Sequence, residues 1–343
     1  MRNDAIGLVR QRRKAPRYSF VIPVYNEEEV LPLLVDRMKD LFVRLDGDAE
    51  AIFIDDGSTD GSVDCLGRLG AGDARFRLVE LSRNFGHQMA ITAGMDAAAG
   101  EAVIVMDADL QDPPEVVLEL IAKWRDGYEI VYARRVRRDG ETWFKRSTAS
   151  LFYWLLARVT KIDIPRDVGD FRLVGRKALE TFRDMPEHDR FVRGMFAWMG
   201  FKQTAVSFER PPRARGETKY PFWKMAHLAV HGIVSFSDTP LRMALWGGLT
   251  VSLLALGYGV YAMLAWALEA GIAQGWTSTI VVVSFLCGIN LFMTGVVGLY
   301  VGGIYSEVKR RPLYVVSKTT SFGDMHPTGK EAGLGAVVSR RTG

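Results

Sequence analysis

The chain has 343 residues, of which 48% are hydrophobic and 24% are charged, and its formal net charge is +4. This length is enough for one large soluble core together with membrane segments. A basic balance can serve nucleic-acid binding, but no recognition module is visible, so we expect no nucleic-acid partner. The two cysteines, Cys65 and Cys287, lie in different regions, and the second sits in an apolar run, which predicts no disulfide and a reducing compartment.

The first part of the chain predicts a sheet built from strands that alternate with helices. Residues 1–17 are polar and basic, so we expect no signal peptide there. The expected strands, some with the loop that follows, are residues 19–27, 51–58, 76–81 and 103–106. Helical periodicity covers residues 28–45, and a helix rich in small residues is expected over 88–99. This alternation predicts a parallel sheet with right-handed crossovers.

Two acidic residues directly follow the fourth strand. Asp107 and Asp109 lie at its carboxyl end, where open α/β sheets bind ligands, and Ala108 between them leaves room for a nucleotide. Gln111 adds another oxygen two positions later. Hard oxygen ligands suit Mg²⁺ or Mn²⁺, which proteins usually share with substrate phosphates. The alternative for a D-x-D pattern taken alone is a solvated acidic turn.

Motifs at the other strand ends favour the metal interpretation. They are PVYNEEE from Pro23, IDDGSTDGS from Ile54, LSRNFGHQMAITAGMDAA from Leu81 and MDADLQDPPE from Met106. In this order the four motifs resemble glycosyltransferase family 2, and most of all its polyprenyl-phosphate glycosyltransferase branch. The resemblance covers roughly residues 18–315 and implies an α/β fold of the GT-A type, with a Rossmann-like, mostly parallel sheet.

The resemblance and the hydropathy together predict five parts of the chain. They are a basic tail (1–17), a GT-A catalytic domain (18–221), an interfacial amphipathic helix (222–240), two transmembrane helices (241–306) and a cytoplasmic C-terminal tail (307–343).

The resemblance also implies the site residues. Those expected to bind the nucleotide sugar are Pro23, Tyr25, Glu27, Asp55, Asp56, Asp107, Arg215 and Lys219. Tyr25 and Asp56 would hold the base, and Arg215 and Lys219 lie in a basic loop whose cations suit a diphosphate. Asp109 and Gln111 would bind the Mg²⁺ or Mn²⁺ cofactor. The expected contacts to the lipid phosphate are Arg134, Arg146 and Ser150.

The resemblance to glycosyltransferase family 2 places Asp170, in the segment VGDFRL, at the usual position of the catalytic base. The chemistry leaves its role open, because a phosphate monoester has a second pKa near 6 and is largely ionised at neutral pH. Asp170 would then orient the acceptor or stabilise a developing oxocarbenium ion. A third interpretation is an acid at the start of a strand that accepts backbone N–H groups.

Two long apolar runs predict membrane spans. Residues 243–268 and 280–305 carry no charge, and each run is long enough to cross a bilayer. The connector between them contains no Lys or Arg, whereas both outer flanks do, which predicts an outside connector and a cytoplasmic catalytic domain. A buried soluble hairpin is the alternative. Residues 144–159 and 222–236 suit either core helices or helices lying in the headgroup region.

These features predict an inverting glycosyltransferase in the bacterial cytoplasmic (inner) membrane. It would move one sugar from a nucleotide-diphosphate donor to polyprenyl phosphate, and the loop GETKY favours UDP-glucose by resemblance. The resemblance also implies a homo-oligomer, a tetramer. One rival is a processive polysaccharide synthase, which carries a Q-x-x-R-W segment that this sequence lacks. The other is a non-catalytic membrane scaffold, against which the intact Asp107, Asp109 and Asp170 argue.

Overall fold

The computed structural model describes residues 15–135, 168–188, 190–209, 239–267 and 276–322. These residues form two compact units. The first contains the sheet and its covering helices, and it includes the described residues that follow Arg310. The second contains the two long apolar helices.

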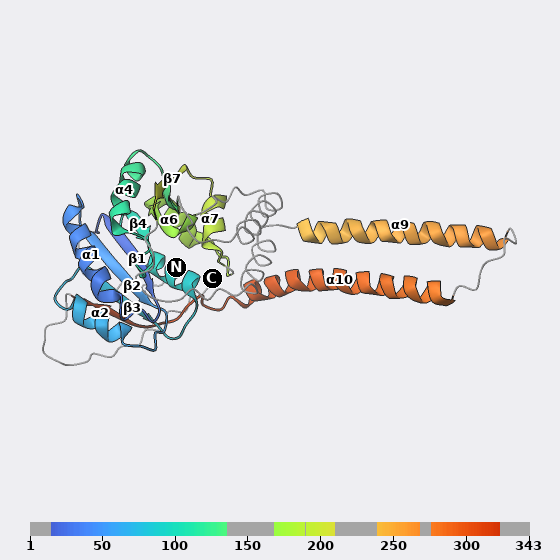
Figure 1. Cartoon of the computed structure of the whole chain (residues 1–343), viewed down its shortest axis with the longest axis horizontal. Coiled ribbons are helices and arrows are strands. Elements are labelled where there is room, and N and C mark those ends of the chain that lie inside the picture. The colour runs from blue at the N-terminus through green and yellow to red at the C-terminus, as the bar shows by residue number, and fades with distance from the viewer. Residues whose placement is uncertain (1–14, 136–167, 189, 210–238, 268–275, 323–343) are drawn as a thin grey trace. The chain divides into compact units, whose positions relative to one another are not determined.

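The first unit is built on a mixed sheet of eight described strands (Figure 1). They are β1 (Tyr18–Val24), β2 (Ala49–Asp55), β3 (Phe76–Leu81), β4 (Ala102–Val105), β5 (Ile130–Arg135), β6 (Val168–Gly175), β7 (Gln203–Phe208) and β8 (Val316–Ser321). Their order across the sheet is β7-β5-β6-β4-β1-β2-β3-β8. The four strands predicted from the sequence, β1 to β4, are parallel as expected. β6 runs antiparallel to both β4 and β5, and β8 runs antiparallel to β3.

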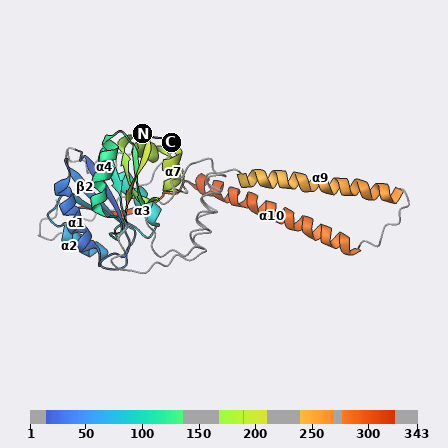
Figure 2. The ribbon, with the colours of Figure 1, turned by 45° about the horizontal axis from the view of Figure 1, so that its top comes forward.

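Helices cover both faces of this sheet. They are α1 (Leu31–Arg44), α2 (Ser62–Gly70), α3 (His87–Ala97), α4 (Val117–Arg125) after the short η2 (Pro114–Val116), α6 (Arg176–Asp184) and α7 (Val192–Trp198). Buried side chains of α1, α2 and α4 share one apolar cluster with one face of the strands. Helix α3 contacts β1 and β2 as well as α6, and α6 contacts α7. Figure 2 shows α1, α2 and α4 on one side of the sheet and α3 and α7 on the other side.

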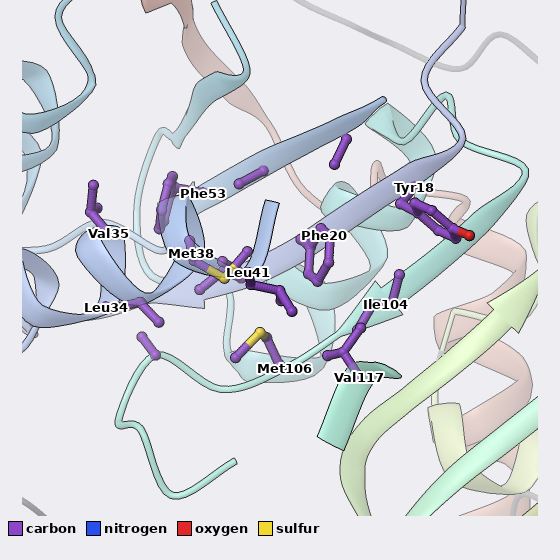
Figure 3. Packing of buried hydrophobic residues seen from close by; sticks show 14 of the residues in the cluster. Tyr18, Phe20, Leu34, Val35, Met38, Leu41, Phe53, Ile104, Met106 and Val117 are labelled. Atoms are coloured by element: carbon purple, nitrogen blue, oxygen red, sulfur yellow. The ribbon is translucent and has the colours of Figure 1, made fainter. Parts of the chain in front are cut away.

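The core explains why the central strands are apolar along their whole length. Phe20 of β1 packs in the cluster with Met38 and Leu41 of α1 and with Ile104 of β4 (Figure 3). Val21, the next residue along β1, points to the opposite face because side chains alternate along a strand. There a Cβ added to Gly94 of α3 would collide with Val21. The glycine therefore lets α3 lie close against the sheet.

β8 corrects the predicted boundary of the C-terminal tail. Residues 316–321, assigned from the sequence to a separate tail, are an edge strand paired with β3. Phe322 after it is buried against α2, where a Cβ on Gly70 would collide with its ring. Val315 accepts the Ser82 N–H at 2.9 Å. The strand VSKTTS gives no hydrophobic period in the sequence, because none of its side chains is buried on either face of the sheet.

The second unit contains α9 (Thr239–Ala267) and α10 (Trp276–Lys309), which contact each other. By length and composition, Thr239–Tyr261 and Val281–Lys309 qualify as membrane spans, with mean hydropathies of 1.5 and 2.0. At about 1.5 Å per residue, both helices exceed the roughly 30 Å of a bilayer core. α9 begins at Thr239, so the last two residues of the predicted interfacial helix (222–240) belong to it; the rest of that helix and residues 144–159 lie outside the described residues.

Candidate active site

The site lies at the carboxyl ends of the parallel strands, where the backbone register brings two acids together. Val105, the last residue of β4, pairs with Arg172 of the antiparallel β6. Asp107 lies two residues after Val105, and Asp170 lies two residues before Arg172. If the same pairing is extended beyond the end of β4, these two acids lie opposite each other. An aspartate near the start of β6 thus reaches the same edge as one after β4, because the two strands run in opposite directions.

The Asp170 carboxylate is buried, 7% exposed, and surrounded by hydrogen-bond donors. Arg193 of α7 donates from Nε to Oδ1 at 3.0 Å and from Nη2 to Oδ2 at 3.1 Å. Arg172 Nη2 donates to Oδ1 at 3.2 Å, and Gln88 Nε2 donates to Oδ2 at 3.3 Å. His87 Nε2 lies 3.3 Å from Oδ2 and also 3.5 Å from Asp107 Oδ1. His87 therefore bridges the two acids.

The neighbouring side chains determine the pKa values of Asp170 and His87. Burial acts to raise the pKa of Asp170, but the charges of Arg193 and Arg172 and the hydrogen bond from His87 outweigh it and hold this pKa well below its ordinary value. For His87, burial acts to lower the pKa, while the hydrogen bond to Asp170 and the charges of Asp107 and Asp170 raise it overall. Asp170 is thus a stable anion, and His87 takes up a proton more readily than an ordinary histidine.

The carboxyl groups on the β4 side have the opposite character. Burial, followed by repulsion from Asp170 and Asp109, raises the pKa of Asp107. Burial and the charge of Asp107 raise the pKa of Asp112 to about 7. Asp112 Oδ2 accepts the backbone N–H of Asp107 at 3.3 Å, so this buried acid also fixes the main chain of the D-x-D turn. Both shifts disfavour the charged forms of these two acids, although His87 Nε2 lies 3.5 Å from Asp107 Oδ1.

The residues around Asp109 fit a divalent cation. Asp109 Oδ1 accepts the Gln111 N–H at 3.1 Å, which keeps the two predicted ligands in one turn. Within the described ranges, the buried Oδ1 atoms of Asp107 and Asp112 accept no hydrogen bond, so a nearby cation would stabilise them. The described residues hold no group of three His, Cys, Asp or Glu side chains set to bind a metal. Mg²⁺ does not require one, since one or two carboxylates with substrate phosphates and water suffice.

The loops after β1 and β2 pack against each other and border the same edge. Asn26, at a positive φ of 56°, donates its N–H to Ser58 Oγ at 3.0 Å and accepts the Thr59 N–H at 2.8 Å. Asp55 accepts the N–H groups of Gly57 and Ser58, each at 3.2 Å. The motifs PVYNEEE and IDDGSTDGS therefore form one surface.

Asp56 ties a third loop to this surface. Its two carboxylate oxygens accept the N–H groups of Phe85 at 2.7 Å and Gly86 at 3.0 Å, just before α3 begins at His87. Burial dominates and raises the pKa of Asp56, although these two hydrogen bonds act to lower it. The buried acid thereby fixes the loop that presents His87. Gly57 at the turn is needed because a Cβ there would lie 2.7 Å from the backbone of Arg83 and Asn84.

The structure brings some predicted nucleotide contacts to the surface and not others. Tyr25 is 47% exposed directly after β1, so its side chain is accessible from the solvent. Glu27 is partly exposed in the same loop, and its N–H donates to Ser62 Oγ at 2.9 Å. Pro23 is buried inside β1 opposite Ile54, so only the backbone around it can border a nucleotide.

The predicted contacts to phosphate groups are mostly outside the described residues. Arg146, Ser150, Arg215 and Lys219 all lie there. Arg134 is described and exposed on β5, where it pairs with Val168 at the start of β6.

Five residues around Asp107 and Asp170 were not predicted from the sequence as parts of the site. They are His87, Gln88, Asp112, Arg172 and Arg193. The first four lie inside motifs that the sequence analysis quoted, so their motif membership was an available signal. Arg193 lies on α7, outside every motif, and its role depends on the packing of that helix.

Comparison with known proteins identifies the family. Residues 19–183 match the model of glycosyl transferase family 2. The uncharacterized glycosyltransferase YkcC of Bacillus subtilis (strain 168) is 47% identical over 303 residues, which cover 88% of this chain and 94% of that protein. The chain belongs to glycosyltransferase family 2. The predicted enzyme class, a glycosyltransferase, and the predicted GT-A α/β fold are thereby confirmed.

Other relatives extend this comparison. A prophage bactoprenol glucosyl transferase homolog of Escherichia coli (strain K12) is 38% identical over 302 residues, which cover 88% of this chain and 99% of that protein. Such relatives confirm the prediction that this chain belongs to the polyprenyl-phosphate glycosyltransferase branch of family 2. A crystal structure of Mycobacterium tuberculosis glucosyl-3-phosphoglycerate synthase with Mn²⁺, UDP-glucose and phosphoglyceric acid has a TM-score of 0.44 and 20% identity, covering 64% of this chain and 78% of that one. This likeness says nothing about the substrate of this chain.

Proposed function

We propose that this protein transfers glucose from UDP-glucose to a polyprenyl phosphate, with inversion at the anomeric carbon, and releases UDP. The observation that carries the substrate class is the E. coli relative named for bactoprenol glucosyl transfer, which matches 88% of this chain and 99% of its own length. The paired acids at the sheet edge supply a site for the chemistry. The two apolar helices, α9 and α10, suit an acceptor that resides in a bilayer.

In this proposal a phosphate oxygen of the acceptor attacks the anomeric carbon of glucose. The bond from that carbon to the β-phosphate oxygen of UDP breaks, and the leaving diphosphate takes the electron pair. No base is required, because the acceptor phosphate is largely a dianion at neutral pH. Asp170, fixed as an anion by Arg193 and Arg172, would stabilise the positive charge that develops on the sugar ring.

The donor would lie across the surface formed by the loops after β1, β2 and β4. Tyr25 and Asp56 would hold the base. Asp55 and Asp107 would contact the rest of the nucleotide and the sugar. Asp109 and Gln111 would hold Mg²⁺ or Mn²⁺, which when bound neutralises charge on the leaving diphosphate. Arg215 and Lys219 would add cations on the other side of the diphosphate, while Arg134, Arg146 and Ser150 would receive the lipid phosphate.

The topology is part of the same proposal. With the connector between α9 and α10 outside and the basic flanks inside, the sheet would face the cytoplasm of a bacterium. A homo-oligomer, a tetramer by the resemblance, would present several such sites on one membrane.

A donor screen with the purified full-length protein tests the proposal. Undecaprenyl phosphate is offered with a panel of nucleotide sugars and Mg²⁺, and nucleoside diphosphate release and the lipid product are measured. We expect UDP-glucose to give the fastest release and one hexose on the lipid, in β-linkage. Asp109→Ala is the inactive control.

Three outcomes would contradict it. Products with many sugars per lipid would indicate a processive synthase. A different preferred donor would retain the acceptor but overturn the glucose assignment. Absence of release with every donor, from folded protein that binds the lipid, would favour the scaffold alternative.

A further inference from the structure

Arg193 reaches the buried Asp170 from an element that carries none of the family motifs. It lies on the first turn of α7 and is separated from Asp170 by 23 positions in the sequence. Its Nε and Nη2 atoms bind one carboxylate oxygen each, at 3.0 and 3.1 Å. This is the two-bond fork that a planar guanidinium forms with a carboxylate, and it sets the orientation of the carboxylate plane.

The second arginine beside Asp170 has a different set of partners. Arg172 is fully buried and donates to the backbone oxygens of Gly169 at 2.9 Å and Asp170 at 3.2 Å. Its guanidinium lies 5.3 Å from the ring centroids of both Tyr132 and Phe196. Arg172 thus holds the start of β6, with a single bond to the Asp170 carboxylate. Both hydrogen bonds described for Arg193 end on that carboxylate.

The position of Arg193 is itself rigid. Phe196, one turn further along α7, stacks on Phe182 of α6 with ring centroids 5.1 Å apart and an angle of 12° between the planes. Both rings are fully buried. The Arg193 side chain is 31% exposed, so the fork lies where the buried acid meets the open side of the site. A group held by packed helices can orient a partner better than one on a mobile loop.

We propose that Arg193 is a positioning residue for the sugar transfer, acting through the orientation of Asp170. The inference rests on the proposed function. Its fork would keep the Asp170 carboxylate aimed at the anomeric carbon, so that its charge is available as the sugar becomes positive. A lysine would supply the charge but cannot fix the plane. The contribution of Arg193 should therefore be seen in the rate of the chemical step and not in the binding of donor.

Arg193→Gln and Arg193→Lys test this in the full-length enzyme with both substrates. We expect Arg193→Gln to lower kcat by roughly 100-fold, as for loss of one oriented electrostatic group, with the KM for the nucleotide sugar changed by less than about threefold. Arg193→Lys should recover only part of the rate. Added guanidinium, but not the same concentration of NaCl, should partly restore an Arg193→Ala variant.

Arg176→Gln is the matched control, since Arg176 is a half-buried arginine on the neighbouring helix, paired with Glu180 at 2.9 Å and not with Asp170. It should retain wild-type rates. Three results would overturn the inference: an unchanged kcat in Arg193→Gln, a raised donor KM with normal kcat, or full activity in Arg193→Lys. A rate loss that follows a loss of folded protein, judged by melting temperature, would make Arg193 structural instead.

A double-mutant cycle in thermal unfolding separates this inference from the proposed function. The loss of melting temperature from Arg193→Gln should be smaller in an Asp170→Asn background, because the two residues are partners. Equal losses in both backgrounds would overturn the pairing, whatever the substrates are. A wild-type protein that shows this coupling but transfers no sugar would overturn the proposed function, and the role in transfer with it.

Discussion

At the scale of single residues, the site contains acids with opposite environments, two of which lie beside the same histidine, His87. Two arginines and a hydrogen bond from His87 hold the pKa of Asp170 low, whereas the partly buried Asp107 and the fully buried Asp112 have raised pKa values. Sites whose acids are driven apart in pKa usually divide their roles. Asp170 accepts hydrogen bonds from two arginines, whereas the buried Oδ1 atoms of Asp107 and Asp112 accept none from the described residues.

The first prediction concerns the metal. Asp109→Ala should remove nearly all transfer and weaken Mn²⁺ binding, measured by electron paramagnetic resonance with UDP present, because Asp109 supplies a hard oxygen ligand. EDTA should inactivate the wild type, and Mg²⁺ or Mn²⁺ should restore it. Asp126→Ala, at an exposed acid paired with Lys123, is the control and should behave as wild type. Full activity of metal-free enzyme would refute the assignment.

The second prediction concerns Asp170. Asp170→Asn keeps the shape of the side chain but removes its charge, so kcat should fall by about 100- to 1,000-fold while the donor KM changes little. Steady-state rates with saturating polyprenyl phosphate measure both constants. If Asn matches the wild-type kcat, then Asp170 serves the fold alone.

The third prediction follows from the lowered pKa of Asp170. A carboxyl group with a folded-state pKa below its unfolded value contributes stability that is present above the unfolded pKa and is lost as pH falls through the folded pKa. With an unfolded value of about 3.9, the melting-temperature gap between wild type and Asp170→Asn should not narrow from about pH 6.5 to 5. It should begin to narrow near pH 4 and close only as the pH falls through the lower, folded-state pKa of Asp170. A gap that already narrows between pH 6.5 and 5 would show that the pKa is not lowered.

At the scale of secondary-structure elements, β8 returns the chain to the sheet after the apolar helices. Its strand pairs with β3, and the Tyr314 hydroxyl just before it donates to Asp96 Oδ2 of α3 at 2.8 Å. Only six residues, 310–315, separate the end of α10 from the start of β8. The edge of the sheet is therefore completed by residues that follow both apolar helices in the chain.

The fourth prediction tests the anchoring of β8. Phe322→Ala should destabilise the first unit by about 3–5 kcal/mol, because the buried ring against Gly70 would leave a cavity. Thr319→Ala, at an exposed position of the same strand, is the control and should change stability by less than about 0.5 kcal/mol. Chemical denaturation followed by tryptophan fluorescence measures both. Equal stability of the two variants would mean that the edge strand adds little to the sheet.

At the scale of the whole molecule, the chain combines a soluble-type α/β unit with two helices whose side chains are apolar and exposed. Leu253 and Leu254 of α9 and Leu291 and Phe292 of α10 are each at least 60% exposed. A soluble protein rarely leaves such long apolar surfaces uncovered, whereas a bilayer would cover them.

The fifth prediction tests the topology in cells. In a background with Cys287→Ser, Gln274→Cys in the connector should react with a membrane-impermeant thiol reagent added outside, and Arg12→Cys should react only after lysis. The reason is the absence of Lys and Arg from the connector, against their presence on both outer flanks. The reverse labelling pattern would overturn the cytoplasmic placement of the sheet.

From the amino-acid sequence alone we predicted the first four strands, the helices after β1 and β3, both apolar helices and the acids at the strand ends. These features depend on local periodicity and on motifs, which a single chain displays directly. Tertiary structure decided the rest. The antiparallel β6 brings Asp170 opposite Asp107, β8 pairs with β3 from the far end of the chain, and α7 places Arg193 on Asp170. Such contacts depend on register and helix packing between distant segments, so no local pattern in the sequence predicts them.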